Sequence, residues 1–377
     1  MRHFLLLAVS LAMLAAAAPA EAKAPAGFVG TMLDGPAARP SFGARRLARE
    51  LDVMRTTGIG TLRVVWSWRR TQPYVSWAAV PRSQRARLRD VAGLPLATAP
   101  LDRLAGLAAR RGIRLLPVTL ETPAWNVRAF VPGSPPREVE PYEAFMRALV
   151  SRYGSGGAFW REHPRLPRLP VRWWQLWNEP HLRVNWASRR WAAEYTRLLR
   201  AGSRGVRADA RAKVVMAGLA SDAHPVWDNL DALLAEGAGT AVDVVAAHVF
   251  TRRPVDVVRA LRRVRGTLRA YGLGRLPIAL TEWSWPSSQG RRGGHGRLSW
   301  ETTPRGQAQR VAAALRLLGR ERGSLRLATA VHYTWLGTDR GRDWSAWAGL
   351  RRLLADGRVV AKPALRAFAR AVRALRR

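Results

Sequence analysis

Two glutamates stand in short motifs that could carry out acid–base and nucleophilic chemistry together. Glu179 lies in the motif Trp-Asn-Glu-Pro (177–180) and Glu282 in Thr-Glu-Trp (281–283), each at the end of an apolar run. When two carboxyl groups face one bound molecule, one can stay protonated as an acid while the other stays ionised as a nucleophile. An isolated glutamate is more simply a surface or salt-bridged residue, so the interpretation depends on the pair.

The two glutamates end the fourth and seventh of eight expected strands. Short apolar runs, typical of buried parallel strands, occur at 28–32, 62–66, 113–120, 171–177, 213–219, 242–249, 276–281 and 327–333. Apolar residues with helical spacing separate these runs. Eight βα units predict the α/β class and a single-domain (β/α)8 TIM barrel, with long loops after strands 2, 3 and 7. Strands 4 and 7 then lie across the barrel mouth from each other, so both carboxylates can face one ligand.

Composition excludes several other chemistries. The chain has 377 residues, of which 48% are hydrophobic, enough for a globular core, and it has no cysteine. Disulfide frameworks, thiolate zinc sites and cysteine nucleophiles are therefore ruled out. No two of the seven histidines are four residues apart, and no Gly-x-Gly-x-x-Gly follows the first strand. We expect neither a metal nor another cofactor.

The beginning of the chain has the pattern of a secretory signal peptide. A short basic start (1–3) precedes an apolar run (4–18), and Ala-Glu-Ala (20–22) offers a cleavage site. The expected domains are a signal peptide at 1–22 and a barrel at 23–377, and we expect a secreted, extracellular protein. An uncleaved anchor is the alternative. No later run has eighteen apolar residues, which predicts no stable membrane insertion.

The net charge of +37 comes almost entirely from arginine. These arginines are spread over every expected helix, which favours a general preference for arginine at solvated positions over a nucleic-acid site. We therefore expect no nucleic-acid partner. The loop 290–297 is the open case, because Arg291, Arg292 and Arg297 could either recognise an acidic sugar or simply be solvated.

The chain resembles the retaining glycoside hydrolases of the (β/α)8-barrel clan A, the cellulase-type clan that includes families 5 and 39. Trp-Asn-Glu-Pro and Thr-Glu-Trp are the two hallmark motifs of that clan, and the resemblance extends over nearly all of residues 23–377. It implies that Glu179 is the general acid/base and Glu282 the nucleophile. It also implies that Asn178 holds the sugar 2-hydroxyl and that Arg63 supports the nucleophile.

Further substrate contacts follow from the same resemblance and from strand position. Trp125 lies in a Thr-Pro-Ala-Trp segment found after the third strand in several of these families, and Trp335 follows the eighth strand, where an aromatic floor is usual. Trp66 ends the second strand, where an indole could stack on a sugar. His248 lies on the sixth strand and is either a sugar contact or a hydrogen-bonded core histidine.

Two positions depart from the pattern of the clan. Phe250 stands where a tyrosine commonly follows the sixth-strand histidine, so a phenol beside the nucleophile is missing unless Tyr333 replaces it. His181 stands where an asparagine is frequent. Both departures leave the catalytic pair intact, and the substrate and exact family stay open.

The expected function is that of a monomeric secreted glycosidase with a carbohydrate substrate. It would cleave O-glycosidic bonds of a poly- or oligosaccharide with retention of configuration, through a covalent glycosyl-enzyme, with carboxyl groups about 5–5.5 Å apart. A non-catalytic carbohydrate-binding barrel and a cationic cell-envelope or polyanion-binding protein are the alternatives. The residues do not distinguish the sugar, the linkage, endo from exo action, or hydrolysis from transglycosylation.

Overall fold

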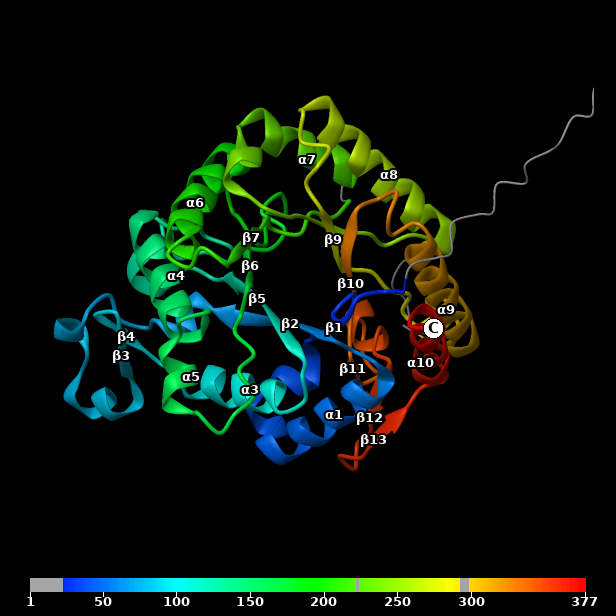
Figure 1. Cartoon of the computed structure of the whole chain (residues 1–377), viewed down its shortest axis with the longest axis horizontal. Coiled ribbons are helices and arrows are strands. Elements are labelled where there is room, and N and C mark those ends of the chain that lie inside the picture. Colours follow the sequence, from blue (N-terminus) through cyan, green and yellow to red (C-terminus); the bar gives the residue numbers. More distant parts are fainter. Residues whose placement is uncertain (1–22, 222–223, 292–297) are drawn as a thin grey trace, which may run out of the picture.

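The eight expected strands form one parallel sheet that is rolled into a barrel (Figure 1). The computed structural model describes residues 23–221, 224–291 and 298–377. Within this part, the sheet order is β7-β6-β5-β2-β1-β10-β9-β8, and single bridges between Val215 and Val244 and between Leu219 and Ala247 join its two edges. The (β/α)8 architecture expected from the sequence is confirmed. The barrel strands are β1 Val29–Leu33, β2 Thr61–Ser67, β5 Arg114–Leu120, β6 Trp173–Leu176, β7 Lys213–Val215, β8 Val245–His248, β9 Ile278–Glu282 and β10 Leu327–His332.

One long helix follows each barrel strand and covers the outside of the sheet (Figure 1). The chain returns after β10 through α10, whose buried Leu365, Phe368 and Val372 pack it against its neighbours, chiefly α9. The covering helices are α1 Ala44–Thr57, α3 Ala99–Ala109, α4 Glu140–Tyr153, α6 Trp191–Val206, α7 Val226–Ala235, α8 Pro254–Ala270, α9 Pro304–Arg320 and α10 Pro363–Leu375; two short helices are α2 Trp68–Thr71 and α5 Ala158–Glu162.

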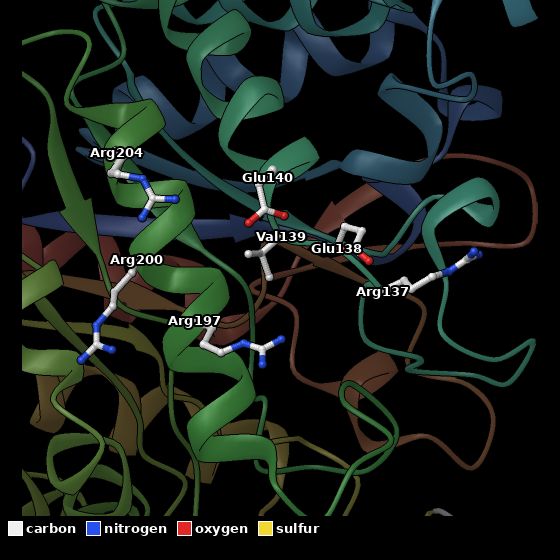
Figure 2. A pocket seen from close by; sticks show the side chains of 7 residues that line it. All are labelled: Arg137, Glu138, Val139, Glu140, Arg197, Arg200 and Arg204. Carbon is white, nitrogen blue, oxygen red and sulfur yellow. The ribbon is translucent and has the colours of Figure 1, made fainter.

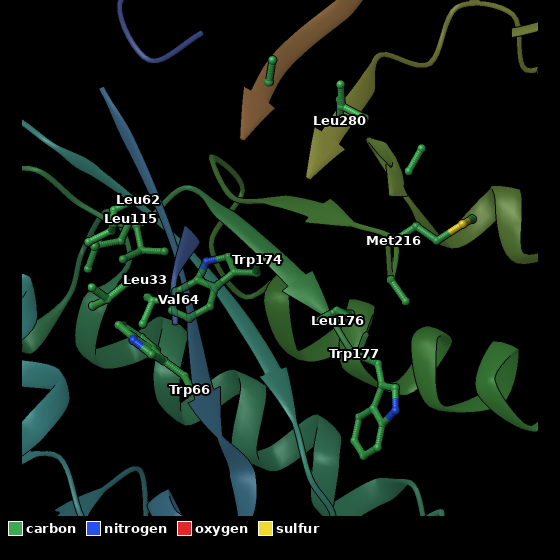
Figure 3. Close-up of a cluster of buried hydrophobic side chains, with 14 of the residues drawn as sticks. Leu33, Leu62, Val64, Trp66, Leu115, Trp174, Leu176, Trp177, Met216 and Leu280 are labelled. Atoms are coloured by element: carbon green, nitrogen blue, oxygen red, sulfur yellow. The ribbon is translucent and has the colours of Figure 1, made fainter. Parts of the chain in front are cut away.

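The core lies mainly between the strands and this helical layer (Figure 3). Alternate residues of a strand face opposite sides of the sheet, and β2 shows the consequence. Its Trp66 packs on Tyr153 of α4 and on Trp174 of β6, with ring centroids 4.9 and 5.7 Å away. Arg63 is of opposite parity and faces the barrel interior, where it meets Glu282 of β9. One face of β2 therefore packs against the helices, and the other directs Arg63 towards Glu282 inside the barrel.

Two small sheets decorate the loops at the ends of the barrel strands. The loop after β2 carries the hairpin of β3 Arg89–Val91 and β4 Leu94–Leu96. The loop after β10 contains β11 Leu336–Gly337, β12 Arg351–Leu353 and β13 Val359–Ala361, a three-stranded sheet that the sequence did not predict. Short 3-10 turns occur at Gly35–Ala38, Pro40–Phe42, Trp77–Ala79, Arg82–Arg87, Ala124–Asn126, Ala238–Ala241 and Trp344–Trp347.

Two sequence-based expectations concern residues outside the described part. The expected signal peptide, 1–22, lies there, and so do residues 292–297 of the arginine-rich loop, including Arg292 and Arg297. Among the helices of the described residues, none is long and apolar enough to cross a membrane.

Candidate active site

Glu179 stands on a tight turn just after β6. Trp177 and Glu179 adopt left-handed backbone conformations, with φ of 73° and 43°. Such conformations cost about 1–3 kcal/mol for residues other than glycine, and they persist where neighbouring contacts enforce them. Here the backbone N–H of Glu179 donates to the carbonyl of Gly218, 3.0 Å away, beyond the end of β7. The turn directs the carboxyl group to the mouth of the barrel, where its side chain is 16% exposed.

Glu282 is the last residue of β9 and approaches Glu179 from the other side. Its side chain is 11% exposed, and its Oε1 lies 2.5 Å from Nη1 of Arg63. One carboxylate oxygen of Glu179 and one of Glu282 lie within 4.8 Å of each other. Residues that are 103 positions apart in the chain thus form one carboxyl pair, because their strands end at the same rim of the barrel.

Arg63 connects the two motifs from the interior of the barrel. It is 1% exposed, and its Nε donates to Oε1 of Gln175 at 2.7 Å. Its Nη2 donates to Oδ1 of Asn178 at 2.7 Å, while Nη1 binds Glu282. A guanidinium holds its N–H groups in a rigid plane, so these three contacts fix its orientation. Arg63 therefore positions Asn178 and compensates the charge of Glu282 at the same time.

His248, at the end of β8, lies between the two carboxyl groups. Its Nδ1 is 2.7 Å from Oε1 of Glu179 and its Nε2 is 3.7 Å from Oε1 of Glu282. The side chain is fully buried, and this burial lowers the pKa of the imidazole to about 3, so the ring is neutral at physiological pH. Gly218 makes the position possible, because any Cβ there would overlap the imidazole.

Burial raises the pKa of both carboxyl groups, by penalising their charged forms. At Glu282 this effect is opposed by the charge of Arg63 and by its direct hydrogen bond, while the charge of Glu179 raises the pKa further. At Glu179 it is opposed by the charges of His181 and Arg63 and by hydrogen bonds from Asn185 and Asn178. Among the described residues, a guanidinium forms an ion pair with Glu282 but not with Glu179, so Glu282 is the group better suited to stay ionised and Glu179 the one better suited to hold a proton.

The same three side chains have the composition of a metal site. One ligand atom from each of Glu179, His248 and Glu282 lies within 4.8 Å of the others. Two features oppose a divalent cation at this position. Arg63 already places a permanent positive charge on Glu282, and the two nitrogens of His248 face different carboxylates instead of one shared point. The geometry fits an ion-pair network better than a metal centre.

Half-buried aromatic rings form a wall beside Glu282. Phe250 follows β8 and stacks on Trp300, with ring centroids 5.9 Å apart. Trp344 packs edge-on against Phe250 at 5.0 Å and lies 5.4 Å from the ring of Tyr333. Burial raises the pKa of the Tyr333 phenol, and the nearby charges of Asp34 and Glu282 raise it further. Sequence reasoning missed Trp300 and Trp344, because nothing in their local pattern distinguishes them among 17 tryptophans.

Comparison with known proteins bears on the fold that holds this site. No family model and no curated protein matches the chain. Solved structures share its architecture, among them the following three. A glucosidase from Croceicoccus marinus is 18% identical with a TM-score of 0.61, covering 86% of this chain and 63% of its own. A family 39 glycoside hydrolase from the gut symbiont Bacteroides cellulosilyticus is 17% identical with a TM-score of 0.63, covering 93% and 64%. A family 39 β-xylosidase from Caulobacter crescentus is 19% identical with a TM-score of 0.60, covering 93% and 72%.

The chain has the fold of the clan A glycoside hydrolases. It spans a little under two thirds of the length of the first two of these proteins. The resemblance named from the sequence is thus confirmed for the fold. Within this fold, the structure brings together Glu179, Glu282, Asn178, Arg63 and His248.

Two aromatic expectations are wrong. Trp335 is 0% exposed and its indole N–H donates to Glu50 at 2.8 Å, so the ring cannot form a sugar floor. Trp66 is 1% exposed, because its side of β2 faces helix α4. Both errors arise because a position near a strand end does not reveal which face of the sheet a side chain occupies.

The remaining expected contacts are placed differently. His248 is wholly buried, so a direct sugar contact is wrong and the hydrogen-bonded alternative describes it. The hydroxyl of Tyr333 donates to Asp34 at 2.6 Å, so it does not stand in for a phenol that bonds Glu282. Trp125 is half-buried in the loop after β5, and its N–H donates to the carbonyl of Gln72 at 3.1 Å.

A hollow on the outside of the barrel is lined by several arginines, but glutamates lie among them (Figure 2). It has a volume of about 300 Å³ and is lined by Arg137, Glu138, Val139, Glu140, Arg197, Arg200 and Arg204. Carboxylates stand among the cations, and Arg204 is paired with Glu143 at 2.7 Å. Arg200 donates to the carbonyl of Glu236 at 3.1 Å. The mixed charges fit the expectation that arginine serves as a general solvated cation.

Proposed function

We propose that the chain is a secreted retaining glycoside hydrolase that cleaves O-glycosidic bonds of an oligo- or polysaccharide. The observation that carries the proposal is the carboxyl pair at the barrel mouth, with an arginine bound to one member only. One oxygen of each carboxyl group lies within 4.8 Å of one oxygen of the other. Inverting enzymes need roughly 6.5–9.5 Å between their carboxyl groups to admit a water molecule. The short distance favours direct attack by one carboxylate, and the shared fold of known glycosidases supports the same chemistry.

In the first step the glycosidic bond breaks while a bond to Glu282 forms. Ionised Glu282 attacks the anomeric carbon, and protonated Glu179 gives its proton to the departing glycosidic oxygen. Arg63 keeps Glu282 ionised in spite of its burial. The products of this step are a glycosyl ester on Glu282, a free leaving-group hydroxyl and an ionised Glu179.

In the second step water replaces the ester. Glu179 accepts a proton from water, the resulting hydroxide attacks the anomeric carbon, and the bond to Glu282 breaks. The ester has meanwhile removed the negative charge of Glu282, which is one of the causes that keep a proton on its neighbour. The same residue can therefore act first as acid and then as base. Two inversions at one carbon give net retention.

Neutral His248 would determine which oxygen of Glu179 carries the proton. If Nδ1–H donates to Oε1, 2.7 Å away, that oxygen is occupied and Oε2 holds the transferable proton. The amides of Asn178 and Asn185 approach Oε2 only to 3.4 Å, which leaves it open to a leaving group. His248 then acts as a positioning residue for the acid.

An extended substrate fits the surroundings of the pair. The aromatic wall of Phe250, Trp300 and Trp344 lies beside Glu282, where a bound sugar ring could stack. On the side of Glu179, where the leaving group departs, Phe130 is 90% and Val184 68% exposed. Their loops are joined by a hydrogen bond from Ala187 to Gly133. Exposed apolar side chains at such a rim suit further sugar residues of a chain, and export through the N-terminal segment would bring the protein to extracellular glycans.

The proposal is tested with aryl glycosides of several sugars, using the wild-type protein, Glu179→Ala and Glu282→Ala. Glu179→Ala should keep activity on activated leaving groups, which need little protonation, and azide should increase it. Glu282→Ala should lose on the order of 10⁴-fold or more on all substrates. NMR of the first product should show retained configuration. An inverted product, or equal activity of Glu282→Ala and wild type, would overturn the proposal.

The two alternatives give different results in the same experiments. A non-catalytic barrel would bind oligosaccharides without turnover of any aryl glycoside. A polyanion-binding protein would bind with a steep dependence on salt concentration, indifferent to substitution of Glu179 or Glu282.

A further inference from the structure

A second cavity lies at the opposite end of the barrel from the carboxyl pair. Its volume is about 510 Å³, within the range of small-molecule sites. It is surrounded by the amino-terminal ends of barrel strands, including Phe28 before β1, Thr61 of β2, Arg114 of β5 and Trp173 of β6. The chain segment 25–28 forms one of its sides. Nothing in the proposed glycosidase reaction uses this end of the molecule.

The charged side chains that line the cavity are all cationic. Arg114, Arg168 and Arg172 line it, and no carboxylate does. One N–H of Arg114 donates to the carbonyl of Ala26, and one N–H of Arg168 donates to the carbonyl of Ser155. A guanidinium has five N–H donors, so each of these two keeps others for a ligand. This cavity therefore differs from the outer hollow of Figure 2, where glutamates alternate with the arginines.

The walls below the arginines are apolar. Leu115, Leu116 and Leu169 line the cavity together with Trp173, whose half-buried ring packs against the hydrophobic cluster inside the barrel. Two threonines that line it are already engaged. The hydroxyl of Thr61 donates to the carbonyl of Gly27 at 2.7 Å and that of Thr329 to the carbonyl of Phe28 at 2.9 Å.

The combination of cationic and apolar side chains determines which kind of ligand fits the cavity. A sugar would bury several hydroxyls against apolar side chains, and each unsatisfied group costs about 1–3 kcal/mol. A hydrocarbon or aromatic body meets no such cost and gains from burial. An anionic head at the mouth would bind the guanidiniums through charge-assisted hydrogen bonds.

We propose that this cavity binds a small amphipathic anion, in which an apolar body lies against Trp173 and Leu169 and a single carboxylate or phosphate head binds Arg168 and Arg172. The site is separate from the carboxyl pair and does not depend on the glycosidase proposal. Carboxylate and phosphate heads share the recognition chemistry, and the experiment below distinguishes them.

Titration calorimetry of the purified chain with decanoate, decyl phosphate and decanol, below micelle-forming concentrations, tests the site. Both anions should bind saturably at one site, and decanol roughly tenfold or more weaker. The tighter anion identifies the preferred head. Added salt should weaken the binding of both anions and leave the binding of decanol unchanged. Equal binding of decanol and decanoate, or no saturable binding of either anion, would overturn the proposal.

Variants separate the cavity from general attraction to a cationic protein. The double variant Arg168→Ala with Arg172→Ala should bind decanoate roughly tenfold or more weakly than the wild type. Arg82→Ala with Arg85→Ala removes the same charge from an exposed turn of the β2–β3 loop and should have no effect. Leu169→Asp, which places a carboxylate at the edge of the cavity, should abolish anion binding and leave aryl glycoside hydrolysis unchanged. Equal losses in the two double-arginine variants would show that the cavity is not the site.

Discussion

Arg63 and Glu282 form an ion pair of 2.5 Å that is almost completely removed from solvent, with side-chain exposures of 1% and 11%. The other N–H groups of the guanidinium are held by Gln175 and Asn178. Removal of one partner from a buried ion pair lowers the stability of the fold by more than the intact pair contributes to it, because the remaining charge is buried without a counter-charge. The pair therefore links the protonation state of Glu282 to a residue on a different strand of the barrel.

Arg63→Lys should shift the acidic limb of the pH profile of kcat/KM to higher pH. Burial raises the pKa of Glu282, and Arg63 is one of the groups that oppose this rise. A lysine has one ammonium group and cannot make the three directed contacts of the guanidinium, so a smaller fraction of Glu282 is ionised at a given acidic pH. Arg265→Lys is a matched control, because Arg265 is also buried but binds backbone carbonyls far from the site. An unchanged acidic limb in Arg63→Lys would contradict the role given to this pair.

Glu179→Gln should stabilise the protein above about pH 4.5 while it reduces activity on unactivated substrates. Burial raises the pKa of Glu179 in the folded protein above its ordinary value of 4.5. The folded state thus binds the proton more tightly, and stability is lost as pH rises from the unfolded towards the folded pKa. Glutamine does not ionise and avoids this loss, so the Tm difference should be near zero at pH 4 and rise by a few degrees at neutral pH.

The control for this measurement is Glu236→Gln, an exposed glutamate at the end of α7, which should not change Tm at any pH. Differential scanning calorimetry from pH 4 to pH 8 compares the three proteins. A Tm difference for Glu179→Gln that is constant with pH would show that the proton is not held more tightly in the folded state.

The sequence was sufficient to predict the barrel because buried parallel strands leave a strong local signal. All eight runs overlap with strands; Glu282 ends β9 as expected, and Glu179 lies on the turn just after β6. The contact between Arg63 and Glu282 was predicted from the family resemblance, and the alternation of residues along β2 explains why the Arg63 side chain faces the interior.

The sequence failed where packing of distant segments decides the outcome. Trp335 and Trp344 are both tryptophans after β10, yet one binds Glu50 in the core and the other joins Phe250 beside the site. No local pattern separates them, because the small sheet of β11 to β13 that lies between β10 and α10 has no clear periodicity in the sequence. His248 was ambiguous for the same reason until the position of Gly218 was known.

Trp344→Ala should lower kcat/KM for oligosaccharides about tenfold, mainly through KM, because it removes an indole face that a sugar would contact. Trp77→Ala, in a loop on the outside of the barrel where Trp77 binds Asp90, is the control and should have no effect. Trp335→Ala should instead lower the free energy of unfolding by roughly 3–5 kcal/mol, the usual cost for a buried tryptophan. Equal KM values for wild type and Trp344→Ala would show that the wall does not bind substrate.

Prolonged treatment with EDTA should leave aryl glycoside hydrolysis unchanged. The three potential ligands Glu179, His248 and Glu282 are already engaged with one another or with Arg63. Assays after dialysis against EDTA, and again after addition of Zn²⁺ or Mn²⁺, measure this directly. Loss of activity with the chelator and recovery with either ion would show that the cluster is a metal centre.

Gly218→Ala and His248→Gln should lower kcat to a similar extent, roughly 10²-fold. A Cβ on residue 218 would displace the imidazole from its place between the carboxyl groups, and His248→Gln removes the ring itself. Because both changes interrupt the same contact with Oε1 of Glu179, the double variant should be no worse than either single one. Gly266→Ala in α8, where an added methyl group meets no neighbour, serves as the matched glycine control. Additive losses in the double variant would mean that Gly218 and His248 act independently, and His248 would then not be the residue that positions the acid.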